Sequence, residues 1–524
     1  LISILFYAYI LIMYESIPIN LYSLSNFLSD SSSNNSLKSV EYINTRDCDS
    51  IYNKCHKNLD SEINDFIVFG DWGGLCNTKQ KKTADNMLNY HKNIDLVISV
   101  GDNFYHPDSD EDDSDDFDEQ LSKKSQYDKL IKQLKKIPKK DKNKIARIKR
   151  ELDNFKLMDS DKMKRKSLLK YIYDGNYEQY IKYQFKHSFI NCYKHLLSKP
   201  WYLCLGNHDV EPIVDRDDMG LYQICADKYN TFNPFCDGYE IPQTRLSNWN
   251  MPSFYWNAIH NNVQFLFLDT NMLHFLEINN FITYINILKS SLLLRYNNNQ
   301  QQSIINKTYN RIIEKIAILN GINTKEYYEY FKKRDTKFSF YNNMPINSQI
   351  DNQLKWFINC LLNNNLPWNI VIGHHPPHFY PHKDKPGKDI GIMPPICIIS
   401  LLIQLYNCIS INIVQAYFSG HVHNCQHIYN SESLCHEIIT GNGGTDLDKT
   451  KNKNIIDHYK NKHIDIWDNL QKYGLETLLD YNNVYDKSHG FVKCSISEDT
   501  LLVDIIYSNN ETIAQTISIP KTLF

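Results

Sequence analysis

The sequence predicts a layered α/β fold, in which buried strands alternate with helices and polar side chains gather where the strands end. Short apolar runs rich in β-branched residues recur along the chain, and each ends abruptly in glycine and polar residues. Four or five consecutive apolar residues are typical of strands buried on both faces. Helical patterns lie between these runs, for instance in residues 350–364. This alternation favours layers of helices on sheets, with the chemistry on strand-end loops.

The chain begins with an apolar, unbroken stretch, LISILFYAYILIM. It is too short for a comfortable membrane span and fits the apolar core of a secretory signal peptide. We therefore expect residues 1–15 to be a signal peptide, with an uncleaved N-terminal membrane anchor as the alternative. Either would direct the chain into the secretory pathway, as a secreted protein or one in the lumen of a vesicle or vacuole. Residues 16–60 are rich in Ser and Asn and predict a poorly ordered, low-complexity lead-in.

Overall charge and cysteine content exclude some classes of protein. The net charge is −3 and the isoelectric point about 6.7, which gives no general attraction to nucleic acid or to anionic membranes. The 13 cysteines are scattered without CxxC pairs, which argues against a structural zinc site. Disulfide bonds are compatible with a secretory protein, but the sequence leaves their pairing open.

Five of the apolar runs end in motifs that carry potential ligands or catalysts. Glycine lets the chain turn sharply at the end of each strand, so the polar residues after it are delivered to one edge of the sheet. The five runs are FIVFGDWGG (66–74), LVISVGDNFY (96–105), YLCLGNHD (202–209), IVIGHHPPH (370–378) and AYFSGHVH (416–423).

Four further apolar runs predict additional strands, and one longer apolar stretch predicts a helix followed by a strand. The additional strands lie in residues 263–270, 437–444, 490–496 and 501–508. Residues 394–420 contain Pro at their start and Asn and Gln inside, so they predict a core helix followed by a buried strand and not a membrane span.

Two stretches do not fit the layered pattern. In residues 108–180 an acidic block is followed by dense Lys and Arg, and residues 281–346 are rich in Asn and Gln. Blocks of like charge are usually solvated segments or charged helical hairpins. We interpret both stretches as insertions into a single domain that spans residues 61–524.

The polar residues of the five strand-end loops are suitable ligands for two metal ions. Carboxylate, amide and phenolate oxygens suit a harder ion, and imidazole nitrogens suit a softer one. A carboxylate between two ions can bridge them at about 3.5–4 Å, the spacing of two-metal phosphoryl-transfer sites. The polar residues that these loops expose are Asp71, Asp102, Tyr105, Asn207, His208, His374, His421 and His423.

The order of the motifs, GDWG, GDNFY, GNHD, GHHP and GHVH, resembles that of the metallophosphoesterases, and specifically of the purple acid phosphatases. WNMPSFYW (249–256), LDT (268–270), QLKW (353–356) and ITGNGG (439–444) are similar to segments of the same family. The resemblance is greatest to the small, tartrate-resistant type. It covers about residues 62–107 and 180–524, apart from the second insertion. It implies the calcineurin-like fold, a four-layer α-β-β-α sandwich of two mixed sheets.

The resemblance also implies how the ligands are shared between two ions. Asp71, Tyr105 and His423 would hold Fe(III), with Asp102 as the bridge. A phenol with a pKa of about 10 ionises readily only beside a strongly charged cation, which makes Fe(III) the natural partner of a tyrosine. The remaining ligands would hold a divalent Fe, Zn or Mn ion; they are Asn207, His374 and His421.

The activity that the resemblance implies is that of an acid phosphatase, which hydrolyses phosphate monoesters by attack of a metal-bound hydroxide. His208 directly follows a ligand and is expected to bind phosphate and protonate the leaving group. The family's second acid histidine has two candidates here, His382 and His378. Neither aligns with the usual spacing, where Lys383 stands, and we favour His382.

Four lesser expectations concern neighbouring residues and partners. His375 occupies a position that is often Tyr in the family and is expected to shape the pocket. Asp209 would either orient an imidazole or cap its turn, and His427 is expected to be structural. The expected partners are phosphorylated small molecules or phosphoproteins, with no nucleic acid, and the chain is expected to be a monomer that meets a membrane only through an uncleaved N-terminal segment.

Two other functions remain open at this point. A phosphodiesterase could use the same two-metal site, because the geometry of the leaving group decides between the two substrates. The second alternative is a catalytically weak, phosphatase-like scaffold, similar to the glideosome-associated anchors of gliding parasites, since one fold can serve unrelated functions.

Overall fold

The computed structural model describes residues 55–106, 133, 148–149, 164, 167–172, 174–211, 219–226, 248–321, 346–377, 382–385, 388–390, 396–447, 484–485, 488–509 and 513–521. They belong to one compact unit, Asn44–Phe524. The expected signal segment 1–15, most of the lead-in and most of the insertion 108–180 lie outside the described residues. Among the helices in the described ranges, none is both long and apolar enough to cross a bilayer.

A seven-stranded mixed sheet contains the first three motif strands. Its order is β17-β16-β15-β2-β3-β4-β5. The segment β2 to β5 is parallel, while β15, β16 and β17 run antiparallel to their neighbours. The strands are β2 (Asp65–Phe69), β3 (Leu96–Ser99), β4 (Trp201–Leu203), β5 (Trp249–Asn250), β15 (Gly490–Ile496), β16 (Thr500–Tyr507) and β17 (Ile513–Pro520).

An eight-stranded mixed sheet contains the other two motif strands. Its order is β1-β6-β7-β8-β11-β13-β12-β14, and β7, β8, β11 and β13 are parallel to one another. The strands are β1 (Cys55–Asn58), β6 (Trp256–Ile259), β7 (Val263–Phe267), β8 (Trp368–Ile372), β11 (Ala416–Ser419), β12 (Cys425–Asn430), β13 (Cys435–Thr440) and β14 (Val484–Tyr485). β9 (His382–Lys385) and β10 (Lys388–Ile390) form a separate antiparallel pair.

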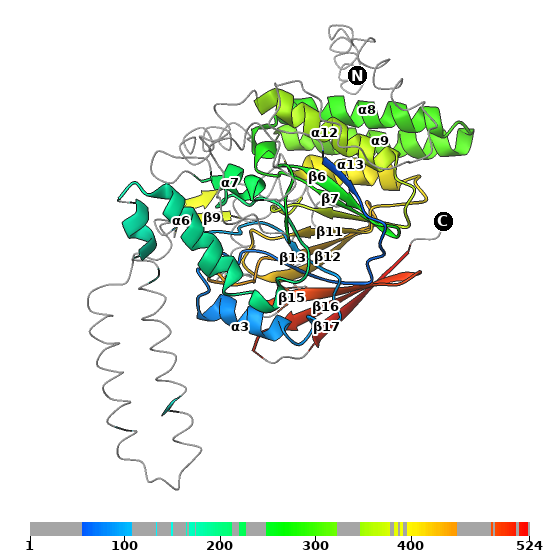
Figure 1. Ribbon diagram of the computed structural model, residues 1–524. Helices are drawn as coiled ribbons and strands as arrows, with labels where there is room; N and C mark the ends of the chain where they lie inside the picture. Colours follow the sequence, from blue (N-terminus) through cyan, green and yellow to red (C-terminus); the bar gives the residue numbers. More distant parts are fainter. Residues whose placement is uncertain are drawn as a thin grey trace. The chain divides into compact units, whose positions relative to one another are not determined.

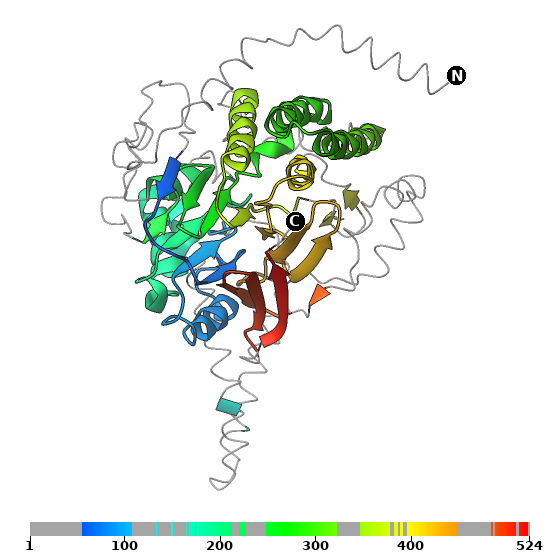
Figure 2. The ribbon, with the colours of Figure 1, turned by 90° about the vertical axis from the view of Figure 1, so that its right-hand side faces the viewer.

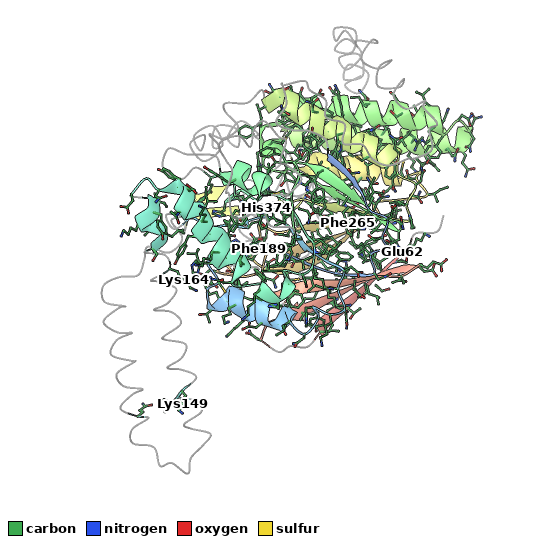
Figure 3. All side chains as sticks on the ribbon, viewed as in Figure 1. Glu62, Lys149, Lys164, Phe189, Phe265 and His374 are labelled. Carbon is green, nitrogen blue, oxygen red and sulfur yellow. The ribbon has the colours of Figure 1, made fainter. Side chains whose placement is uncertain are left out.

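The two sheets share one hydrophobic core. Alternate residues of both sheets belong to a single buried cluster, and Phe66 of β2 meets Phe265 of β7 edge-on, with ring centroids 5.4 Å apart. Phe265 lies in the interior among these side chains (Figure 3). The motif strands are buried along their length except for Asp65 at the start of β2, as expected for strands covered on both faces.

Helices cover the outer faces of the sheets (Figure 1, Figure 2). The blue α3 and the teal α6 lie on the side of the seven-stranded sheet, and the green and yellow α8, α9, α12 and α13 lie on the side of the eight-stranded sheet. The expected α-β-β-α sandwich of two mixed sheets is therefore confirmed. The helices are α3 (Thr78–Met87), α6 (Tyr177–Gln184), α7 (Met219–Cys225), α8 (Phe281–Arg295), α9 (Asn299–Gly321), α12 (Ile346–Leu362) and α13 (Cys397–Asn407).

Short helical turns complete the connections. A π-helix (Phe185–Ile190) continues directly from α6, and three 3₁₀ turns follow at Lys194–Leu196, Met272–Phe275 and Ile278–Asn280.

Several predicted elements can be compared directly with the structure. The helix predicted in residues 350–364 is α12, and the stretch 394–420 forms a helix, α13, followed by the strand β11, as predicted. The described part of the Asn-rich insertion forms α8 and α9, which pack against each other and against α13. β1 lies within the segment interpreted as a lead-in and pairs with β6 at the edge of its sheet.

Candidate metal centre

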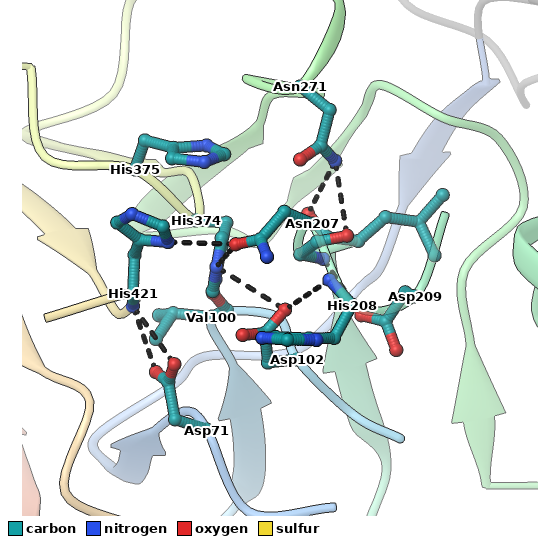
Figure 4. Close-up of polar contacts among 12 residues, drawn as sticks. Asp71, Val100, Asp102, Asn207, His208, Asp209, Asn271, His374, His375 and His421 are labelled. Atoms are coloured by element: carbon teal, nitrogen blue, oxygen red, sulfur yellow. Dashed lines mark hydrogen bonds and ion pairs between the residues drawn. The ribbon is translucent and has the colours of Figure 1, made fainter. Parts of the chain in front are cut away.

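The five motif loops meet at the carboxyl ends of β2, β3, β4, β8 and β11 (Figure 4). The loops approach so closely that side chains are excluded at the glycines. A Cβ atom on Gly206 would collide with the carboxylate of Asp102, and one on Gly420 with that of Asp71. Three polar residues take up left-handed backbone conformations to enter the site: Asp71 (φ 57°), Asp102 (φ 51°) and His421 (φ 66°).

The first cluster of donors is rich in oxygen. The hydroxyl oxygen of Tyr105 lies 3.3 Å from Asp71 Oδ1, 3.0 Å from Asp102 Oδ2 and 3.4 Å from His423 Nε2. His423 Nε2 is also 3.4 Å from Asp71 Oδ1. Both carboxylates are buried. These four side chains therefore present one nitrogen and several oxygens to a common point.

The second cluster is rich in nitrogen. The amide oxygen of Asn207 lies 3.0 Å from His374 Nε2 and 2.8 Å from His421 Nδ1 (Figure 4). Asp102 joins this cluster to the first, because its Oδ1 is 3.4 Å from His374 Nε2 while its Oδ2 contacts Tyr105. All seven predicted ligands thus lie together, with Asp102 between the two groups.

Backbone carbonyls fix the orientation of two imidazoles. His374 Nδ1 donates to Val100 O at 2.9 Å, and His423 Nδ1 donates to Asp446 O at 2.8 Å. Each bond places the hydrogen on Nδ1 and leaves Nε2, which faces the cluster, as an acceptor. His421 is turned the other way and presents Nδ1 to Asn207. The Asp446 contact could not be predicted from the sequence, because any residue type can contribute a backbone carbonyl.

The electrostatics of the site favour cations. Burial acts to raise the pKa of Asp102, but His374 and His208 outweigh it and hold that pKa well below its usual range. Burial, Asp102 and Asp71 together raise the pKa of Tyr105 well above its usual value. Burial also raises the pKa of Asp71, although His423 opposes this. A phenolate at Tyr105 therefore requires a positive charge at the point where these oxygens converge.

The donor sets fit two metal ions. Two groups have ligand atoms that all lie within 4.8 Å of one another: Asp71, Asp102 and His423, and His374, His375 and His421. The first group includes both carboxylates and suits a harder ion, while the second consists of imidazoles and suits a softer one. His375 belongs to the second group, and the sequence analysis had assigned it only to the shape of the pocket.

His375 is held by a hydroxyl and by a second histidine. Its Nδ1 lies 2.8 Å from Thr270 Oγ1, and its Nε2 lies 3.2 Å from His274 Nε2. The ring stands beside His421, with centroids 4.4 Å apart. His375 and His274 therefore form part of the wall behind the nitrogen-rich cluster.

His208 is positioned by Glu211, which the sequence analysis missed. The backbone N–H of His208 donates to Asp102 Oδ1 at 2.9 Å, and its Nδ1 lies 2.9 Å from Glu211 Oε2. The imidazole lies against the ring of Tyr105, with centroids 4.5 Å apart. A carboxylate three residues after the histidine was the signal that could have identified Glu211.

Asp209 caps its loop. Among the described residues, its carboxylate bonds to amide groups and to no imidazole. Its carboxylate accepts from the backbone N–H groups of Gly206, Asn103 and Phe104 at 2.8, 3.1 and 3.0 Å. Gln223 Nε2 donates to it at 2.8 Å. Asp209 thereby ties together the second and third motif loops.

The remaining predicted histidines lie elsewhere or are only partly described. His427 lies on β12, where its Nε2 is 2.9 Å from His436 Nδ1. His378 lies outside the described residues, and for His382 and Lys383 only the backbone, in β9, is described. The second acid histidine therefore stays a prediction.

A family model, described as calcineurin-like phosphoesterase, matches residues 65–425. The chain belongs to the calcineurin-like metallophosphoesterases. The match includes all seven candidate ligands, from Asp71 to His423, and His208. Members of this family bind divalent metals, in agreement with the two donor groups.

Solved structures provide further comparisons for this metallophosphoesterase. GAP50, the anchor in the inner membrane complex of Plasmodium, is 12% identical, with 88% of this chain and 89% of that chain covered and a TM-score of 0.37. Purple acid phosphatase PPD1 from yellow lupin (Lupinus luteus) seeds is 11% identical, with 88% and 54% covered and a TM-score of 0.39. A dimetal phosphatase from Danio rerio is 11% identical, with 88% and 99% covered and a TM-score of 0.35. No curated protein sequence matches the chain.

Proposed function

We propose that this metallophosphoesterase is an acid phosphatase of the purple acid phosphatase type, which hydrolyses phosphate monoesters. The observation that carries the proposal is the position of the Tyr105 hydroxyl, between the carboxylates of Asp71 and Asp102 and beside His423 Nε2. A neutral phenol here donates to these carboxylates, whereas a phenolate beside them requires a strongly charged cation that binds all of these oxygens.

The proposed ions are Fe(III) in the oxygen-rich cluster and a divalent Fe, Zn or Mn ion in the nitrogen-rich cluster. When bound, such a pair supplies an activated water and neutralises charge on the phosphate oxygens. Asp71, Tyr105 and His423 would hold the first ion, with Asp102 shared between the two. The second would be held by Asn207, His374 and His421, with the ring of His375 beside that of His421.

His208 is the residue proposed to bind the phosphate and protonate the leaving alcohol. Its backbone is anchored to Asp102 and its Nδ1 to Glu211, so Nε2 is the ring nitrogen that would carry the proton to the substrate. Glu211 favours the charged imidazole, which is the form that a general acid requires. Proton donation by a positioned side chain typically contributes about 10²–10⁴-fold to the rate.

The first experiment is a visible absorption spectrum with metal analysis of the same sample, for wild type and Tyr105→Phe. A broad band in the middle of the visible range that vanishes in the variant, with two metals per chain including iron, would support the ferric phenolate. A colourless protein that contains zinc or manganese alone would contradict the iron assignment. A protein that binds no metal would contradict the enzyme and favour the scaffold alternative.

Substrate class needs a separate test. We propose phosphorylated small molecules or phosphoproteins as substrates, in a secreted or vesicular compartment. Comparison of p-nitrophenyl phosphate with bis(p-nitrophenyl) phosphate separates the two chemistries. A kcat/KM higher for the monoester would agree with the proposal, and the reverse order would identify a phosphodiesterase.

A further inference from the structure

Two segments that are far apart in the sequence meet behind the first motif loop. One is the loop that follows Asp71, residues 73–77, and the other is the π-helix Phe185–Ile190 with the turn after it. Ser188 connects them: its Oγ accepts from the backbone N–H of Leu75 at 3.1 Å and donates to Gly73 O at 3.4 Å. The second segment therefore supports the loop that carries a metal-ligand candidate.

The loop at residues 75 and 76 is held in an uncommon conformation. Leu75 has φ 56° and Cys76 has φ 55°, both in the left-handed region that non-glycine residues seldom adopt. The Cys76 N–H donates to Gln80 Oε1 at 2.6 Å, and Gln80 Nε2 donates to Ser188 O at 2.7 Å. Lys164 Nζ donates to the carbonyls of Leu75 and Cys76. Such a conformation persists only where the surroundings hold it in place.

The two segments also bring two thiols into contact. Cys192, in the turn after the π-helix, is 5% exposed, and its thiol lies close enough to that of Cys76 to interact with it. Cys76 is partly exposed. Burial is the main cause that raises the pKa of the Cys192 thiol, and the Cys76 contact adds to it. Cys76 is therefore the more accessible cysteine of the pair and Cys192 the more covered one, so an external disulfide would meet Cys76 first.

We propose that Cys76 and Cys192 form a disulfide bond that fastens the first motif loop to the segment behind it. Neighbouring thiols can be joined at the S–S distance of about 2.05 Å once their backbones allow the approach. The charged insertion, residues 108–180, lies wholly between the two cysteines in the sequence. The disulfide would thus close a long loop, and long loops lose the most unfolded-state entropy when they are closed.

The oxidant is a small-molecule disulfide such as oxidised glutathione, and the reaction is thiol–disulfide exchange. The Cys76 thiolate attacks one sulfur of the donor disulfide, forms a mixed disulfide and releases one glutathione thiolate. Cys192 Sγ then attacks Cys76 Sγ and passes its proton to the departing glutathione thiolate, which forms the protein disulfide and releases the second glutathione as a thiol. Two protein thiols are oxidised, and one small disulfide is reduced to two thiols.

The sequence allows a direct test by peptide mapping. Trypsin cleavage after Lys57, Lys79, Lys186 and Lys194 isolates Cys76 in residues 58–79 and Cys192 in residues 187–194, each with no other cysteine. The reduced full chain is incubated with oxidised glutathione, remaining thiols are alkylated, and the digest is analysed by mass spectrometry without reductant. We expect the two peptides as one cross-linked species that separates on reduction.

Matched variants test the assignment. Cys76→Ser should abolish the cross-linked species, while Cys408→Ser should retain it, because Cys408 is also partly exposed but its Sγ donates to Leu405 O. Recovery of Cys76 and Cys192 as alkylated thiols, or each bound to a different cysteine, would overturn the proposal. The wild-type chain supplies a second measurement that needs no variant: oxidation should raise its melting midpoint by a few degrees, reversibly with reductant. An equal midpoint before and after would also count against the disulfide.

Discussion

The two sheets contribute different chemistry to the same edge of the molecule. The seven-stranded sheet supplies the oxygen donors, which are Asp71, Asp102, Tyr105 and Asn207. The eight-stranded sheet supplies the imidazoles, which are His374, His421 and His423. Each of the two donor clusters takes residues from both sheets. Neither sheet alone carries a complete donor cluster, so the candidate metal centre exists only where the two sheets pack together.

The backbone of each sheet also holds the ligands of the other. Asp71, from the seven-stranded sheet, accepts from the N–H of His421 at 3.1 and 2.9 Å. His374, from the eight-stranded sheet, donates to the carbonyl of Val100. The two kinds of donor are therefore held by two kinds of backbone group. A backbone N–H binds the carboxylate, and a backbone carbonyl binds the imidazole.

The largest effect on metal content and activity is expected from substitution of Asp102, which lies between the two donor clusters. Asp102→Asn removes the charge that contacts both Tyr105 and His374, so we expect loss of both metals and a fall in kcat of more than about a thousandfold. Metal analysis and steady-state kinetics measure the two effects. Asp85→Asn, an exposed carboxylate on α3, is the control. An Asp102→Asn protein that kept two metals would show that this carboxylate is not shared.

Each donor cluster can be disrupted separately by replacement of one of its histidines. His423→Ala should remove iron and the visible band but keep the divalent ion, whereas His374→Ala should do the reverse. Each should lower kcat by more than the 10–100-fold typical of changes outside the ligand sphere. Metal analysis with absorption spectra distinguishes the two variants. Loss of the same metal from both would contradict the division into two clusters.

A smaller effect on activity is expected from Glu211, which contacts His208, the proposed general acid. Glu211→Gln keeps a hydrogen-bond acceptor beside His208 but removes its negative charge. We expect kcat to fall about 10–100-fold, and the alkaline limb of the pH–rate profile to move to lower pH because the imidazolium loses its ionic partner. Glu178→Gln, a surface partner of Lys182, is the control. Unchanged kcat with altered KM would mean that Glu211 serves binding alone.

The smallest expected effect is on the pH dependence of folding stability, and it comes from His106 beside the oxygen-rich cluster. Burial lowers the pKa of His106, next to Tyr105, to about 4, whereas an unfolded histidine has a pKa of about 6.5. Between these values the unfolded chain binds the extra proton, so stability is full above about pH 6.5 and declines as the pH falls towards 4. We expect a loss of up to about 2 kcal/mol between pH 7 and pH 5. His106→Asn should flatten this slope in denaturant titrations at the two pH values, and an unchanged slope would rule out His106 as its source.

Much of the fold and of the ligand set could be predicted because both depend on local patterns. A buried strand that ends in glycine and a polar residue can be recognised in the sequence. Five such strands pointed to seven candidate ligands, which the structure places close together. β1 could not be predicted in this way. Its four residues, CHKN, have no apolar alternation, and they pair with β6 only because that edge is available.

The supporting residues were harder to predict because they act through distant contacts. Asp446 contributes a backbone carbonyl, and Ser188 contacts a loop more than a hundred positions away in the sequence. The choice between two roles for Asp209 depended on three amides that only the folded loops bring together. Spacing can identify a ligand, but it cannot show which backbone groups a carboxylate will meet.

The left-handed conformations at Asp71, Asp102 and His421 have an evolutionary consequence. A non-glycine residue in this conformation costs about 1–2 kcal/mol, and glycine adopts it without that cost. A glycine substitution at one of these positions would remove the candidate ligand and relieve the backbone strain at the same time, so we expect the fold to survive it. Descendants of such a chain can lose the activity and still keep a sound domain, which selection is then free to use for another purpose.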